Sequence, residues 1–183
     1  MCTCAIAWFL TGFGFAYGRD NGDGFIGTTY FVGYDVGRVD QSAANQLSGN
    51  GVTMAFWFFE FTFAATSATI VAGAIAERAR FESYVIYSFV ASAITYPIIV
   101  HWIWGGGFLT LGGPNPVLGL GSLDFAGDGP VHMIGGISGM IASKIMGPRL
   151  GRFDDEGNPV SIPGHSSGTW CMHFLSFLFY APV

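Results

Sequence analysis

The residues best able to do chemistry in this 183-residue chain are a few polar side chains within long apolar stretches. His132 follows Asp124 by eight residues, among small and apolar neighbours. An imidazole can donate or accept a hydrogen bond and can relay a proton, so His132 suits a solute that is neutral or loses a proton. The Asp124 carboxylate and the Trp104 ring face both attract a small cation. These groups predict a route for a small solute that changes its protonation state.

Phenylalanines would form the rest of this route. Phe59 and Phe63 stand one helical turn apart on the same face. Phenylalanine and histidine offer no ring of oxygens to replace the hydration shell of a metal ion, so we expect no metal site. Glu60 fits two interpretations, a vestibule acid or a side chain that snorkels to the interface. His101, three residues before Trp104, is expected to be a solvated histidine at the interface.

The composition indicates which elements must hold these groups. Charged residues make up 10% of the chain and hydrophobic residues 51%, and no charge falls between residues 83 and 123. A water-facing surface cannot be built from such a run, which excludes a soluble fold. The net charge of −5 excludes a nucleic-acid binder, which needs a basic face. The predicted fold class is all-α, a polytopic transmembrane helical bundle without cofactors.

Five apolar stretches approach the ~20 residues that a spanning helix needs. They cover residues 1–18, 51–76, 83–104, 129–146 and 166–183. Gly135 and Gly139 form a pair of small residues typical of tight helix packing. Pro97 predicts a kink inside the third stretch. The Gly/Asp-rich stretch 20–24 lacks the alternating spacing of a calcium loop, so it predicts turns.

The basic residues predict an orientation. The loops 77–82 and 144–165 contain five of the seven Lys and Arg residues, so we expect both loops in the cytoplasm. At 1.5 Å per residue, His132 would then lie about 18 Å above the inner boundary, near the midplane. Phe63 would lie about 22 Å up, and Trp104 about 33 Å up, at the outer surface. Glu60 would lie about 27 Å up, near the outer interface.

Four strings of residues carry a resemblance to a known family. They are AIAERARF (74–81), HWIWGGG (101–107), LDFAGDGPVHMIGGISG (123–139) and GPRLGRF (147–153). In this order they resemble the Amt/Rh ammonium transporter family, and they look most similar to its eukaryotic Amt branch. The resemblance implies passage of ammonium or ammonia, or of the analogue methylammonium, through a pore inside each subunit of a homotrimer. It implies a multi-pass protein of the plasma membrane, in contact with lipid, and not an enzyme.

The resemblance also assigns roles to positions in this sequence. Trp104, Phe59 and Asp124 match the outer site that recruits the cation. Phe63 matches a phenylalanine that gates the pore. His132 matches the first histidine of a hydrogen-bonded pair in the channel. These roles follow the same order as the depths given by helix rise.

Departures from the family pattern suggest an incomplete transporter. Family members have about eleven spans, of which this chain supplies five, and the second pore histidine is absent. We therefore expect a fragment that does not conduct by itself. Glu60 stands where many relatives carry glutamine, so an additional carboxylate near the mouth is expected to alter selectivity.

Three other functions remain open beside transport. Some family members resemble sensors that bind ammonium and signal with little flux. A redox bundle would use His101 and His132 as haem ligands, although their depths differ by about 10 Å. An intramembrane hydrolase is disfavoured because the sequence contains no His-Glu-x-x-His or activated-serine motif.

Overall fold

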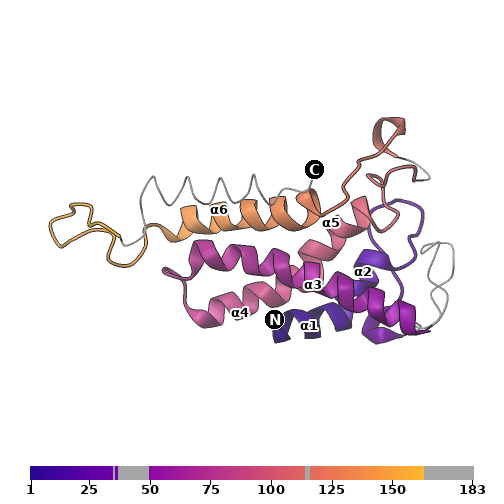
Figure 1. The fold of residues 1–183 in the computed structure, drawn as a ribbon, viewed down its shortest axis with the longest axis horizontal. Coiled ribbons are helices and arrows are strands. Elements are labelled where there is room, and N and C mark those ends of the chain that lie inside the picture. Colours follow the sequence, from indigo (N-terminus) through magenta and orange to yellow (C-terminus); the bar gives the residue numbers. More distant parts are fainter. Residues whose placement is uncertain (35, 37–49, 114–115, 163–183) are drawn as a thin grey trace. The chain divides into compact units, whose positions relative to one another are not determined.

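The computed structural model describes residues 1–34, 36, 50–113 and 116–162, and its regular elements are helices (Figure 1). Two units, residues 1–146 and 147–183, are described separately. The first unit contains α1 (Cys2–Ala7), α2 (Phe13–Tyr17), α3 (Asn50–Ile75), α4 (Phe81–Val90), α5 (Tyr96–Ile103) and α6 (Ile134–Met146).

Widened π-helical turns join these helices into longer runs. Trp8–Gly12 links α1 to α2, Ala91–Thr95 links α4 to α5, and Asp128–Met133 leads into α6. The predicted stretches 1–18, 51–76, 83–104 and 129–146 are therefore helical over 2–17, 50–75, 81–103 and 128–146. The fifth predicted stretch, 166–183, lies outside the described residues.

The turn at Ala91–Thr95 is where the sequence predicts a kink. Pro97 has no N–H, and its ring crowds the carbonyl four residues earlier, which belongs to Ala93. A π-helical turn relieves such crowding by widening the helix. The Thr11 hydroxyl donates to the Ala93 carbonyl at 2.9 Å, so a neighbouring helix supplies a partner for this oxygen.

Two helical stretches within the described chain, Met54–Ile75 and Phe81–Ile103, are long and apolar enough to cross a bilayer. Cys2–Tyr17 is apolar but shorter. The helical class is confirmed, and the number of five spans stays a prediction.

The centre of the first unit is a cluster of aromatic residues packed against α3. Trp8, Phe13 and Tyr96 are at most 2% exposed and lie in one core with Ala64. The Trp8 ring lies 5.9 Å from Phe13 in its own run and 6.0 Å from Tyr96, so the runs 2–17 and 81–103 meet at this tryptophan. Its indole N–H donates to the Trp57 carbonyl at 3.2 Å, which provides a partner for its one polar group.

Small residues allow α6 to lie close against α3 (Figure 1). Gly135 and Gly139 are both buried. A Cβ at Gly135 would lie 2.8 Å from the Ile70 Cβ, and one at Gly139 would lie 3.2 Å from the Ala74 Cβ. The predicted tight packing at this glycine pair is confirmed.

The structure describes residues 147–162 of the second unit, and they form a turn of their own. The Asp154 carboxylate accepts the N–H groups of Glu156 and Asn158. These bonds hold the pKa of Asp154 below its usual range, and the bond from the Asn158 N–H has the largest effect. Arg152 closes the turn by donating to the Val160 carbonyl at 2.6 Å.

Gly135→Ala should destabilise the first unit, because its methyl group would overlap Ile70 in a closely packed contact. We expect a cost of about 1–3 kcal/mol in the free energy of unfolding. Gly136→Ala is the matched control, since a Cβ at that position meets nothing within 4 Å. It should be neutral or stabilise the helix by up to about 1 kcal/mol. Circular dichroism of both variants during thermal unfolding in detergent measures the difference, and equal effects would contradict the packing at Gly135.

Candidate functional site

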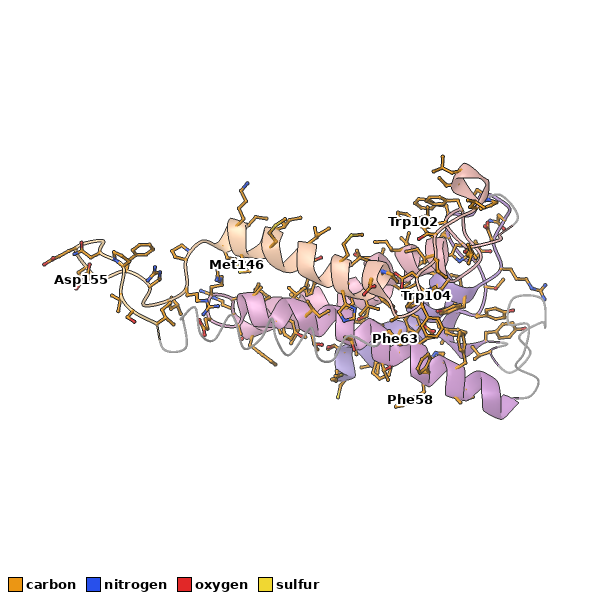
Figure 2. All side chains as sticks on the ribbon, turned by 45° about the horizontal axis from the view of Figure 1, so that its top comes forward. Phe58, Phe63, Trp102, Trp104, Met146 and Asp155 are labelled. Atoms are coloured by element: carbon orange, nitrogen blue, oxygen red, sulfur yellow. The ribbon has the colours of Figure 1, made fainter. Side chains whose placement is uncertain are left out.

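Three aromatic rings form a continuous column between α3 and the end of α5. Phe59 and Phe63 lie one turn apart on α3, with ring centroids 4.8 Å apart and an edge-to-face angle of 86°. The Phe63 centroid lies 5.9 Å from that of Trp104, the residue just after α5 (Figure 2). An edge-to-face pair fixes the angle between its rings, so each ring holds its neighbour in position.

The indole of Trp104 is tied to a loop on its other side. Its Nε1–H donates to the Asp124 main-chain carbonyl at 2.7 Å. Because this bond lies in the plane of the ring, it fixes the ring without covering its faces. A cation is attracted to such a face by the ring quadrupole.

The Asp124 carboxylate organises the start of the following helical run. Oδ1 accepts the N–H groups of Gly127 at 2.6 Å and Asp128 at 3.2 Å, and Oδ2 accepts that of Gly129 at 2.7 Å. These are N–H groups at the beginning of a helix, where donors lack partners within the helix. Asp124 therefore acts as a positioning residue, and its main-chain carbonyl, rather than its carboxylate, contacts Trp104.

Gly127 connects the tryptophan to the histidine. Its φ of 89° lies in the left-handed region, and a Cβ there would lie 3.1 Å from the Trp104 ring and 2.7 Å from Val131. Its carbonyl lies 3.1 Å from Nδ1 of His132. A carbonyl only accepts, so Nδ1 carries the proton in this contact and Nε2 of the neutral ring keeps its lone pair. This tautomer can accept a hydrogen bond or a proton at Nε2.

The column has an open side within the described chain. Phe59 is 54% exposed, and His132 is exposed as well. Contacts link Phe59, Phe63, Trp104 and Asp124 in that order, and Gly127 joins His132 to them. The residues grouped from the sequence as recruiting site, gate and pore histidine are therefore brought together, and their roles stay predictions.

Glu60 does not join this column. It is 5% exposed and faces the Tyr17 and Tyr96 hydroxyls in the interior of the first unit. Phe59 and Phe63, which precede and follow Glu60 on α3, lie on a different face of this helix, where they contact each other. Adjacent residues on a helix differ by about 100° in direction, so Glu60 points away from Phe59 although helix rise gives the two residues similar depths.

The expectation of a solvated His101 is wrong. Its side chain is fully buried, and Nδ1 lies 2.9 Å from the Ala16 carbonyl. Nε2 lies 3.7 Å from Oδ2 of Asp20, in the loop after α2. Two contacts to residues more than 80 positions earlier in the chain explain the burial. Both ring nitrogens face oxygen atoms of the protein, which disfavours His101 as a haem ligand.

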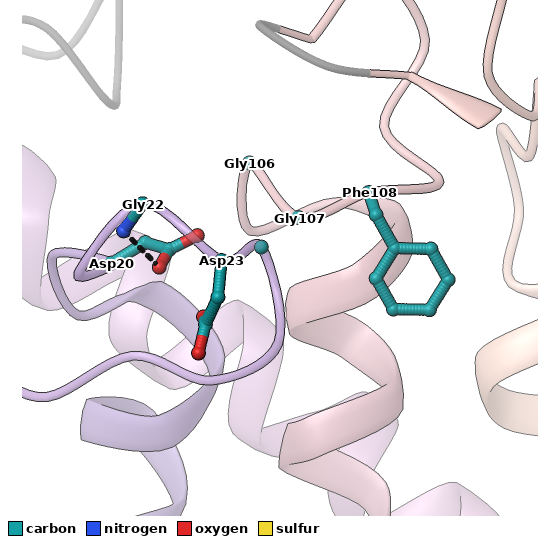
Figure 3. A pocket seen from close by; sticks show the side chains of 7 residues that line it. Asp20, Gly22, Asp23, Gly106, Gly107 and Phe108 are labelled. Carbon is teal, nitrogen blue, oxygen red and sulfur yellow. Dashed lines mark hydrogen bonds between the residues drawn. The ribbon is translucent and has the colours of Figure 1, made fainter.

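The loop containing Asp20 borders a cavity of about 320 Å³ (Figure 3). The cavity is lined by Asp20, Gly22, Asp23, Gly24, Gly106, Gly107 and Phe108. The Asp20 carboxylate accepts the Gly22 N–H at 2.7 Å, and Asp23 accepts the Phe25 N–H at 3.0 Å. These bonds confirm the turns predicted for residues 20–24.

The same loop is joined to the end of α5 by hydrogen bonds. Trp102 donates from Nε1 to the Phe25 carbonyl at 2.9 Å, and the Phe108 N–H donates to the Gly24 carbonyl at 3.2 Å. The Trp102 indole is thus bonded to the loop, while the indole of Trp104, two positions later, is part of the column. Sequence reasoning missed this attachment, since no local pattern pairs segments so far apart.

Comparisons with known proteins agree with this architecture, that of a helical transporter domain. The profile of the Ammonium Transporter Family matches residues 1–180. Ammonium transporter Amt2 of Archaeoglobus fulgidus is 43% identical over 97% of this chain and 37% of its own length. Ammonium transporter 1 member 3 of Solanum lycopersicum is 37% identical over 89% of this chain and 33% of its own. The solved structure of a Sensor Amt Protein has a TM-score of 0.67 and 32% identity, and covers 97% of this chain and 41% of that one.

The chain belongs to the ammonium transporter family. It spans about a third of the length of the two transporters named above. The family consists of transporters, so the prediction that the chain is not an enzyme is confirmed. Relatives from an archaeon and a plant both match well, so the comparisons do not single out the eukaryotic branch.

Asp20→Asn should weaken the loop at neutral pH and lose its effect in acid. Burial tends to raise the pKa of Asp20, but the N–H groups of Gly22 and Gly24, with Asp23 and His101 nearby, bring the pKa below its usual value. A lowered pKa means that the carboxylate stabilises the fold above about pH 3.9, and that this contribution is lost as the pH falls through the folded-state pKa.

Thermal unfolding of both proteins from about pH 7 to about pH 3 measures this effect. The substitution should cost no more than about 1 kcal/mol at neutral pH, and the difference should shrink in acid. Asp155→Asn, in the exposed turn of the second unit, is the control and should change little. A cost that persists unchanged in acid would show that the Asp20 charge is not involved.

Proposed function

We propose that this chain forms part of a pathway that carries ammonium or ammonia across a membrane. The observation that carries this proposal is the connected set of contacts from Phe59 through Phe63 and Trp104 to Asp124 and Gly127, with His132 held beside it. Membership of the ammonium transporter family supports the choice of solute.

Recruitment would take place at the face of Trp104. The ring face attracts the cation, while the bond to the Asp124 carbonyl keeps the ring from turning. Phe59 would line the same outer site. Beyond it, Phe63 offers no hydrogen-bond partner, so a charged solute would lose its water there at a large cost. Release of a proton before this point would lower that cost.

His132 would act on the route rather than at the mouth. With Nδ1 turned to the Gly127 carbonyl, Nε2 can accept an N–H from the solute or take up a proton. We propose Phe63 as a gate. The expectation of Glu60 as an acid at the mouth is not carried forward, because its side chain is buried in the interior of the first unit.

The proposal extends to the membrane, the orientation of the loops and the oligomeric state. The two long apolar helical stretches support insertion into a lipid bilayer. We propose that this bilayer is the plasma membrane and that the chain forms a five-span segment. The basic residues in 77–82 and 144–165 favour the cytoplasm for both loops. We propose a homotrimer with one pore in each subunit, and that the 183 residues do not conduct unaided.

Sensing is a second candidate. Similarity to a solved structure titled Sensor Amt Protein over 97% of this chain favours it. A sensor would keep the recruiting site at Trp104 but would not need appreciable flux past His132.

Trp104→Leu should weaken the apparent affinity for methylammonium and leave appreciable maximal flux. Loss of a cation–π contact of about 0.5–2 kcal/mol corresponds to about 2-fold to 30-fold in affinity. Trp102→Leu is the matched control, because its indole bonds to the Phe25 carbonyl outside the column. Uptake would be measured in a chimera in which this chain replaces the matching segment of Archaeoglobus fulgidus Amt2. Equal loss of affinity in both variants would contradict a recruiting role for Trp104.

His132→Ala should lower the maximal flux, or change whether charge accompanies the solute, more than it changes the apparent affinity. The substitution removes the only ionisable group that the described helices place near the expected midplane. Uptake and current recorded side by side in the same chimera separate the two effects. A change in apparent affinity alone would place His132 at the mouth and invert the proposed order.

A further inference from the structure

A second polar site lies inside the first unit, away from the aromatic column. Glu60 on α3 is 5% exposed, and its Oε2 has no hydrogen-bond partner. The hydroxyls of Tyr17 on α2 and Tyr96 on α5 are also buried without a partner. Buried polar atoms normally have partners, so three such atoms contributed by three helices indicate an unfilled hydrogen-bonding capacity.

The tyrosines are the titratable groups that face Glu60 within the described residues. The Tyr17 hydroxyl comes close to hydrogen-bonding distance of its carboxyl, and the Tyr96 hydroxyl lies near enough to interact with it electrostatically. No basic side chain of the described chain interacts with this carboxyl. The indole of Trp8, in the same core, already donates to the Trp57 carbonyl.

Burial decides which form of the acid such surroundings favour. An ionised carboxylate removed from water without a cation or a full set of donors is strongly disfavoured, and such groups become neutral instead. A carboxylic acid has one O–H to donate and a carbonyl to accept, and a tyrosine hydroxyl can do either. Small side-chain rotations would then allow the acid to donate to one tyrosine and accept from the other.

We propose that Glu60, Tyr17 and Tyr96 form a buried proton-binding site in which the Glu60 carboxyl holds its proton in the folded protein at neutral pH. The site leaves no net charge beside the column, so it does not trap a cation away from the route. It goes beyond the proposed transport function, since it does not depend on which solute passes.

Infrared spectroscopy of the whole chain in lipid vesicles without ammonium tests the site directly. At neutral pH the protein should show a protonated-carboxyl C=O band that is sensitive to deuterium exchange. Glu60→Gln should remove this band, because the amide has nearly the same shape but no titratable proton. Glu82→Gln, at an exposed position in the first turn of α4, is the matched control and should leave the band unchanged.

The tyrosines provide a second measurement that does not require Glu60→Gln to fold. Tyr17→Phe and Tyr96→Phe should each shift the band, because each removes one hydrogen-bond partner of the acid. Absence of a protonated-carboxyl band at neutral pH would overturn the proposal. A band that survives Glu60→Gln, or one that neither tyrosine variant shifts, would also overturn it. None of these readings requires transport, so a failure of the transport proposal would be recognised separately.

Discussion

The hydrogen bonds of the Asp124 carboxylate determine the geometry of the rest of the site. Both oxygens accept N–H groups at the start of the helical run 128–146, which fixes the direction in which that run leaves the loop. Gly127, inside this turn, lies close to the Trp104 ring and presents its carbonyl to His132. Without the carboxylate, three N–H groups would lose their partners, and the relative positions of Trp104 and His132 would no longer be set.

An apolar bundle has to satisfy its polar groups internally, and most of those in the first unit follow this rule. The Thr11 hydroxyl bonds to the Ala93 carbonyl behind Pro97, and the Trp8 indole bonds to the Trp57 carbonyl. Each bond joins two helical runs, so the requirement for a partner also aligns the helices. Against this background, the unpartnered oxygens of Glu60, Tyr17 and Tyr96 stand out because three helices bring them together, and this grouping needs a physical cause.

The end of α5 shows how one helix can serve two purposes. His101 contacts Ala16 in α2 and Trp102 bonds to Phe25 in the loop after α2, whereas Trp104 turns toward α3. The chain turns sharply after α5, and the Gly107 N–H donates to the His101 carbonyl at 2.9 Å in this turn. Trp104 is thus held from both sides, by the attachment of His101 and Trp102 before it in the chain and by the Asp124 carbonyl across from it.

The sequence alone determined the helical class, the approximate position of four helical runs, the irregular turn before Pro97 and the close packing at Gly135 and Gly139. These features depend on local properties: apolar length, a missing N–H, or the absence of a Cβ. Only the tertiary structure decided that Asp124 uses its carboxylate as a helix cap, that His101 is buried against Ala16 and Asp20, and that Glu60 faces two tyrosines instead of the column. Each of these outcomes depends on which atoms surround a polar group, and segments distant in the chain supply several of those atoms. Periodicity and spacing along one helix carry no information about such partners.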